Sequence, residues 1–185
     1  MRKVANLTLF FSENDPFSNW YRSEFKVKEI SFVCVEQFMM FCKAKLFKDD
    51  AAAERILAAE HPRAHKNLGR SVSGYNDAIW NSRRLSIVTH GCYAKFTQNE
   101  DLLQALLETG ETMLVEASPY DRVWGVGLGE NDPRIEDPRN WKGTNLLGQA
   151  LFKTRERIKA ELSAQAYLHT CDHDEATQIR PLKMG

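Results

Sequence analysis

Apolar residues recur along the chain with two different periods, and the change between them predicts most of the elements. Short apolar runs predict strands at residues 7–11 and 112–117, and alternation predicts a β-hairpin of residues 25–27 and 30–33. From Cys34 the apolar residues fall three and four positions apart, which is typical of helices with one buried face. The predicted helices span residues 35–46, 50–60, 77–96 and 100–108, and a last helix, capped by Thr144 or Asn145, runs through Leu162.

Turn-forming residues and loss of period set the boundaries of these elements. Pro62 is expected to end the second helix, and a short basic segment, residues 61–70, follows it. Residues 118–143 are rich in Gly, Pro, Asp and Asn, which indicates a long functional loop. After residue 162 no period remains. We therefore predict an α+β fold, a helix-dominated single domain with a small β-sheet at residues 1–162, followed by a loose polar C-terminal extension at residues 163–185.

Composition narrows the class of protein. Lys and Arg together number 25, as do Asp and Glu, and zero net charge argues against a general nucleic-acid coat protein, though not against a local phosphate site. No apolar run approaches the roughly 20 residues of a membrane span, and the four cysteines form no CxxC pair. We expect a cytoplasmic protein, or a nuclear one in a eukaryote, without membrane association. The polar set His169, Cys171 and His173 is a poor zinc site, and no metal or cofactor is predicted.

Two groups of residues carry candidate chemistry. Glu36 and Lys43 are seven residues apart, almost two helical turns, so both lie on one flank of the apolar stripe. Partial burial there moves both pKa values toward neutrality, which suits an acid or base and an amine nucleophile. A Glu at the edge of the core and a solvated Lys would show the same spacing. Glu116, Asp121, Trp124 and Gly125 form the second group, which reads equally well as a surface loop with one packed Trp.

A third candidate segment, Trp141 to Asn145, leads directly into the predicted start of the last helix. Free backbone N–H groups at a helix start can bind phosphate. Arg70, in the basic segment, is a second candidate for a phosphate.

Several short motifs occur in one order along the chain. They are Phe17-Ser18-Asn19-Trp20, Glu36-Gln37 with Lys43-Ala44, Leu68-Gly69-Arg70, Lys95-Phe96, residues 106–110, Leu114-Val115-Glu116, Asp121 to Gly125, and Trp141 to Gly148. In this order and spacing the chain resembles the NADAR family, also called YbiA-like, over about residues 9–158. It differs from the family pattern by an extra segment, residues 130–139, and by the polar tail.

The resemblance implies an N-glycosidase that cleaves the bond between ribose C1 and an exocyclic amine of a guanine-like ring. The implied substrate is ADP-ribosylated guanine in DNA or a ribosylamino-pyrimidine phosphate of riboflavin synthesis. Because a ribosylamine opens to an imine, Lys43 would attack it as a nucleophile while Glu36 moves protons. A rival route activates water with a carboxylate.

Asp121 completes the implied catalytic set. The residues expected to bind substrate are Asn19, Arg70, Glu116, Trp124, Gly125, Trp141 and Asn145. Two alternatives stay open, a non-catalytic module that binds ADP-ribose or NAD and a regulatory interaction protein. No obligate protein partner is predicted.

Overall fold

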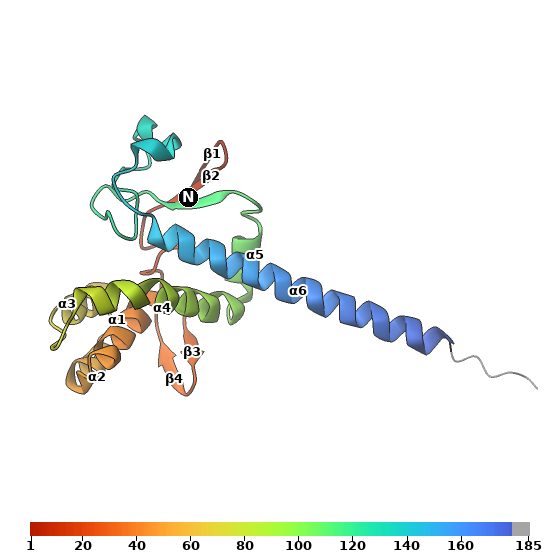
Figure 1. The fold of residues 1–185 in the computed structure, drawn as a ribbon, viewed down its shortest axis with the longest axis horizontal. Helices are drawn as coiled ribbons and strands as arrows, with labels where there is room; N and C mark the ends of the chain where they lie inside the picture. The colour runs from red at the N-terminus through yellow and green to blue at the C-terminus, as the bar shows by residue number, and fades with distance from the viewer. Residues whose placement is uncertain (179–185) are drawn as a thin grey trace, which may run out of the picture.

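Helices make up most of the structure, a computed structural model that describes residues 1–178 and the side chains of residues 1–168 (Figure 1). The strands are β1 (Arg2–Val4), β2 (Leu7–Phe10), β3 (Phe25–Val27), β4 (Ile30–Phe32) and β5 (Met113–Glu116). The helices are α1 (Val35–Leu46), α2 (Asp50–Ala58), α3 (Pro62–Arg70), α4 (Asp77–Thr97), α5 (Glu100–Leu107) and α6 (Leu146–Gln178), with short 3-10 turns η1 (Pro133–Glu136) and η2 (Pro138–Asn140). The predicted helix-dominated α+β class is confirmed.

The main sheet brings two distant loops to one edge. Its strand order is β1-β2-β5, with β1 antiparallel and β5 parallel to β2. In this register Phe10 lies opposite Glu116, so both parallel strands end together. The chain after β2 and the chain after β5 therefore start from the same edge, as loops at the carboxyl ends of parallel strands do.

The sheet separates two apolar cores because side chains alternate between its faces. Phe10 and Leu114 point into the larger core, which is built mainly from α1, α4 and the start of α6. Leu9 and Val115 point into a smaller core that the loop after β5 covers. The extra segment at residues 130–139 contributes Ile135 to this smaller core.

Helix α3 corrects the prediction for the basic segment. Pro62 does not simply close the preceding helix: α2 ends at Ala58, and Pro62 occupies the first turn of α3. Proline is tolerated there because the first N–H groups of a helix have no intrahelical partner. Gly69 then lets α3 approach α1 closely, since a Cβ at this position would lie 1.9 Å from the Sδ of Met40.

A buried lysine holds the loop that follows β2. Lys95, on α4, donates from Nζ to the carbonyl oxygens of Pro16 at 2.6 Å and Ser18 at 3.1 Å. Burial lowers the pKa of Lys95 to about 8. These two hydrogen bonds fix the backbone immediately before Asn19 and Trp20.

The last helix is longer than predicted. α6 packs against α4 and β5 and then continues beyond the body of the molecule to Gln178 (Figure 1). The expectation of a loose tail is therefore wrong for residues 163–178. Residues 162–168 are all exposed and so lack the apolar stripe that sequence patterns detect. None of the helices within residues 1–178 is long and apolar enough to span a bilayer.

The expected side-chain cap of α6 is also wrong, because both candidate side chains bond elsewhere. The Thr144 hydroxyl donates to the carbonyl of Val123, and the Asn145 side chain bonds to β5. The side chains of His169, Cys171 and His173 lie outside the described residues.

Candidate active site

Three carboxylates lie near enough to act on one another's charge, at the end of the main sheet next to the start of α1. Glu116 is the last residue of β5, Asp121 lies in the loop that follows, and Glu36 is in the first turn of α1. The charge of Asp121 raises the pKa of both glutamates, and the charge of Glu36 raises the pKa of Glu116. The fold thus brings together residues from two motifs 80 positions apart in the sequence.

Glu36 is buried and held on several sides. Its side chain is 4% exposed, and its backbone N–H donates to the carbonyl of Asn19 at 2.9 Å. Burial raises the pKa of Glu36 to about 7, against the attraction of the Lys66 charge and a hydrogen bond from Trp20. Indole N–H is a donor only, so Trp20 must donate to the carboxylate. A carboxyl with a pKa near 7 can both give and accept a proton at neutral pH.

Glu116 has an even higher pKa, about 8, chiefly because of burial and then because of the charges of Asp121 and Glu36. Its Oε2 is buried and has no hydrogen-bond partner among the described residues. Asn145 fixes the backbone here: its side chain accepts from the Glu116 N–H at 3.1 Å and donates to the Leu114 carbonyl at 2.9 Å. Asn145 therefore positions Glu116 and has both ends of its amide engaged.

The loop after β5 is tied to itself and to the strand end. Oδ1 of Asp121 accepts from the backbone N–H groups of Val123 and Trp124, each at 2.8 Å. Gly125 makes this closure possible, because a Cβ there would lie 2.9 Å from the carbonyl oxygen of Glu116 and 3.0 Å from that of Asp121. The second Asp121 oxygen, Oδ2, receives neither of these two bonds.

Asn19 adds a second buried acceptor beside the carboxylates. The residue is 6% exposed, and its Oδ1 has no hydrogen-bond partner among the described residues. Buried polar atoms are nearly always paired in folded proteins, by protein groups, water or ligand. The unpaired oxygens of Asn19 and Glu116 therefore indicate that this site receives hydrogen-bond donors, such as hydroxyl or amino groups.

Trp20 and Lys66 also border the site, although the sequence analysis placed Trp20 only in a family motif and Lys66 only in the basic segment at residues 61–70. The Lys66 ammonium lies 5.7 Å from the centre of the Trp20 ring, and its charge lowers the pKa of both Glu36 and Glu116. The spacing of Pro62, Lys66 and Arg70, four residues each, would have placed them on one helix face. A helix end at Pro62 hides this spacing, because it leaves Pro62 outside the helix that carries Lys66 and Arg70.

Lys43 lies further along α1, in an aromatic cage. Its side chain is 9% exposed, and Nζ donates to the Gly69 carbonyl at 2.7 Å while lying 4.2 Å from the centre of the Tyr75 ring and 5.6 Å from that of Trp80. Burial lowers its pKa, and Asp77 opposes that change. Seven residues of helix separate it from Glu36 by about 10 Å along the axis.

The remaining predicted binding residues are spread around this site. Arg70 is exposed, and its charge lowers the pKa of Glu36. Trp124 is half-buried and packs against the larger core. Trp141 lies apart: it packs on the smaller core and donates from its indole N–H to the Ile135 carbonyl at 2.8 Å.

The start of α6 has few free donors for a phosphate. The N–H groups of Leu146 and Leu147 already donate to the carbonyls of Val123 and Trp124. Within the described part of the chain, no three His, Cys, Asp or Glu side chains are grouped so as to hold a metal ion.

Comparison with known proteins identifies relatives over most of the chain. The family model described as NADAR domain matches residues 9–159. An N-glycosidase, R617 of Acanthamoeba polyphaga mimivirus, is 42% identical over 146 residues, which cover 76% of this chain and 85% of that protein. Protein irg-1 of Caenorhabditis elegans is 38% identical over 166 residues, covering 81% and 78% of the two chains.

A solved structure supports the fold. The NMR structure of the E. coli protein YbiA covers 84% of this chain and 86% of its own, with 28% identity and a TM-score of 0.69. More distant relatives include an N-glycosidase of Nostoc punctiforme and a riboflavin biosynthesis protein of Vibrio vulnificus. The chain covers only 40% of the latter.

Proposed function

Because the chain belongs to the NADAR domain family, we propose that this enzyme, a hydrolase of N-glycosidic bonds, removes ADP-ribose from ADP-ribosylated guanine in DNA. The family relatives named N-glycosidases support the reaction class. Zero net charge favours a single modified base as the recognised feature over an extended duplex. The free thiols of Cys34, Cys42 and Cys92 favour the cytoplasm, or the nucleus of a eukaryote, as its location, because thiols stay reduced there.

The observation that carries this proposal is the pair of neighbouring buried carboxyls with raised pKa values, about 7 for Glu36 and about 8 for Glu116. Near pH 7 Glu116 holds its proton and can donate it, while Glu36 can exchange one. Cleavage of a ribosylamine needs such groups, since a proton must reach the departing amine and another must leave the attacking water or amine.

An amine nucleophile would divide the reaction into two steps. A neutral lysine would add to C1 of the ring-opened imine and expel the heterocyclic amine, and water would then hydrolyse the sugar imine. Lys43 is the proposed nucleophile because burial lowers its pKa. To reach the carboxylates it would have to leave the carbonyl of Gly69. Lys66 already lies beside them, so it is the competing candidate.

The direct route needs no covalent lysine. In it, Glu36 or Asp121 would activate water against an oxocarbenium-like C1, and Lys66 would balance the charge of the carboxylates. Both routes share the same proton donor, and they differ in whether a sugar adduct forms on the protein.

The other side chains have proposed binding roles. Asn19 and the free oxygen of Asp121 would accept from ribose hydroxyls, and Arg70 would bind phosphate. Trp124 would stack on the guanine. Gly125 and Asn145 would act by holding Asp121 and Glu116 in place. For Trp141 we propose a supporting role under the same loop.

A second candidate substrate is a ribosylamino-pyrimidine phosphate, which the relatives named riboflavin biosynthesis proteins favour. It carries the same bond between ribose C1 and an exocyclic amine. A module that binds ADP-ribose or NAD without cleaving it would use the same stacking and phosphate residues, but would not need two carboxyls that titrate near neutrality.

The test is a side-by-side turnover assay on an ADP-ribosylated oligonucleotide and on the ribosylamino-pyrimidine phosphate, with release of free base measured by chromatography. We expect faster turnover of the oligonucleotide. Preference for the pyrimidine would select the second candidate, and binding of either without release of base would leave a reader module.

A further inference from the structure

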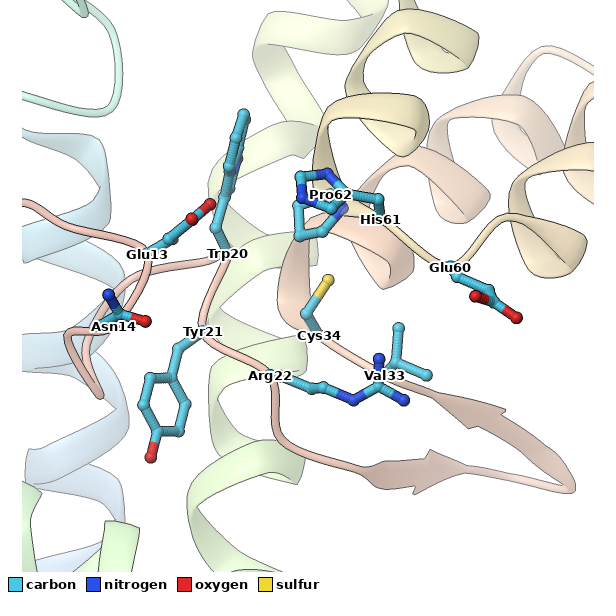
Figure 2. A pocket seen from close by; sticks show the side chains of 10 residues that line it. All are labelled: Glu13, Asn14, Trp20, Tyr21, Arg22, Val33, Cys34, Glu60, His61 and Pro62. Atoms are coloured by element: carbon cyan, nitrogen blue, oxygen red, sulfur yellow. The ribbon is translucent and has the colours of Figure 1, made fainter.

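A pocket of about 380 Å³ opens next to the catalytic site, on the side where α1 and α3 begin. Trp20, Cys34, His61 and Pro62 contribute to its walls and floor (Figure 2). The volume falls at the small end of the range for small-molecule sites, about 300–1,000 Å³. None of the three carboxylates of the catalytic site lines it.

The walls of this pocket suit a flat ring. Figure 2 shows the Trp20 ring on one side of the pocket, the His61 and Pro62 rings on the other, and the Cys34 thiol below the Pro62 ring. The His61 ring is held in place because its Nδ1 accepts from the Arg63 N–H at 3.2 Å. In the neutral ring Nε2 then carries the proton and remains a donor. Burial raises the pKa of Cys34 to about 11, so the floor is an uncharged thiol.

The charges at the rim favour a neutral ligand over a phosphate. Two carboxylates, Glu13 and Glu60, line the pocket together with one guanidinium, that of Arg22. Among the lining residues the carboxylates outnumber the cations, so the lining itself provides no net attraction for a phosphate. Exocyclic amino groups of a heterocycle would instead find acceptors in Glu13 and Asn14.

Trp20 is a wall shared by this pocket and the catalytic site. It lines the pocket, while its indole N–H bonds to Glu36 and its ring lies under Lys66. A ligand bound at the carboxylates can therefore extend past Trp20 into the pocket. On this basis, and resting on the proposed function, we propose that the pocket bounded by Trp20, His61 and Pro62 binds a second planar nitrogen heterocycle of the substrate, separate from the base that is released.

Two parts of the proposed substrate carry such a ring: the adenine of the ADP-ribosyl group and the base next to the modified guanine. Four substrates separate them. Two of them are guanosines whose exocyclic amine carries ADP-ribose in one and ribose 5-phosphate in the other. The remaining two are oligonucleotides that contain one or the other of these modified guanosines. The variant is His61→Asn, which removes the ring and keeps a good N-cap for α3. Asn67→Ala, an exposed change on the same helix, is the matched control.

The quantity measured is the ratio of kcat/KM between substrates with and without the second ring. Removal of one stacking partner should lower this ratio at least about fivefold in His61→Asn and leave it unchanged in Asn67→Ala. A fall that follows the adenosine part identifies adenine as the occupant. A fall seen only in oligonucleotides identifies the neighbouring base. An unchanged ratio, or an equal loss on all four substrates, overturns the proposal.

A binding measurement keeps the pocket testable if no substrate is turned over. Calorimetric titration with adenosine 5′-monophosphate should give at least about fivefold weaker binding to His61→Asn than to the wild type and to Asn67→Ala. Titration with ribose 5-phosphate should show a smaller difference. Adenosine monophosphate binding without any turnover would contradict the N-glycosidase proposal alone. Equal binding to all three proteins, or none to the wild type, would contradict the pocket.

Discussion

Glu36 should make the protein less stable at the pH where it is active, and this can be measured. Its carboxyl is 4% exposed, and burial raises its pKa from 4.5 to about 7. The folded state therefore holds the proton more tightly than the unfolded state does. The corresponding stability is fully present below pH 4.5 and is lost as the pH rises through about 7.

The size of the effect follows from the pKa change. Each pH unit between the unfolded and folded pKa values corresponds to about 1.4 kcal/mol, so ionising Glu36 removes about 3 kcal/mol of unfolding free energy by pH 8. Glu36→Gln keeps the shape and cannot ionise. We expect this variant to be about 3 kcal/mol more stable than the wild type at pH 8, or about 6–12 °C in Tm for a chain of this size. At pH 5 most of the difference should vanish.

The charge of Glu36 also raises the pKa of Glu116. Removing the Glu36 charge lowers the pKa of Glu116 in the folded protein. Ionised Glu116 therefore destabilises the variant less than it destabilises the wild type, which adds to the stability gain of Glu36→Gln at pH 8. Turnover should meanwhile fall by about 100-fold or more, because an acid–base group contributes roughly 10²–10⁴ to the rate.

The assay is urea unfolding at pH 5 and pH 8, with the exposed change Glu54→Gln as the control. A gain for Glu36→Gln that is equal at both pH values would refute the assignment of a raised pKa. Turnover within a few-fold of the wild type would remove Glu36 from proton transfer.

Other consequences of the structure can be checked separately. Borohydride added during turnover should trap a sugar on Lys43, found by peptide mass spectrometry, and Lys43→Arg should be inactive; an adduct on Lys66 would move the nucleophile to α3, and no adduct would favour direct attack by water. ADP-ribosyl-guanosine should quench tryptophan fluorescence through Trp124, which is proposed to stack on the guanine, so Trp124→Phe should lose part of the quench; an unchanged quench in Trp124→Phe would contradict that stacking role. Asn145→Ala should lower the unfolding free energy in urea by about 2–4 kcal/mol, because two hydrogen bonds to β5 are lost, one buried and one partly buried; a loss below about 1 kcal/mol would contradict that positioning role. Turnover should continue in EDTA, and its restoration by zinc or magnesium would contradict a metal-free reaction.

The elements that could be predicted from the sequence are those with an apolar stripe. The expected helices at residues 35–46 and 77–96 match α1 (Val35–Leu46) and α4 (Asp77–Thr97) closely, because both bury one face in the larger core. The sequence pattern does not predict β1 (Arg2–Val4), because this strand is only three residues long and mostly exposed. The pattern does not predict the outer part of α6 either, because an exposed helix has no apolar stripe and depends on the helix propensity of its residues alone.

The candidate carboxylates were accessible to sequence reasoning for a different reason. Glu36 and Glu116 stand at the start of a helix and the end of a strand, where side chains meet loops and not the middle of a core. That the charge of one acts on the other could not be predicted, since it depends on the parallel pairing of β2 with β5 across about 100 residues of chain.

The lysine whose charge acts on Glu36 was harder to assign from the sequence. The helical period gives the direction in which a side chain leaves its helix, but it does not say which neighbouring element packs against that face. Lys43 shares a flank of α1 with Glu36, yet the ammonium whose charge acts on Glu36 belongs to Lys66 on α3. That arrangement depends on Gly69, which lets α3 lie against Met40. The same contact puts the Gly69 carbonyl within 2.7 Å of the Lys43 Nζ. One close approach of two helices thus brings one lysine to the carboxylates and engages the other, so a larger residue at position 69 should disturb both at once.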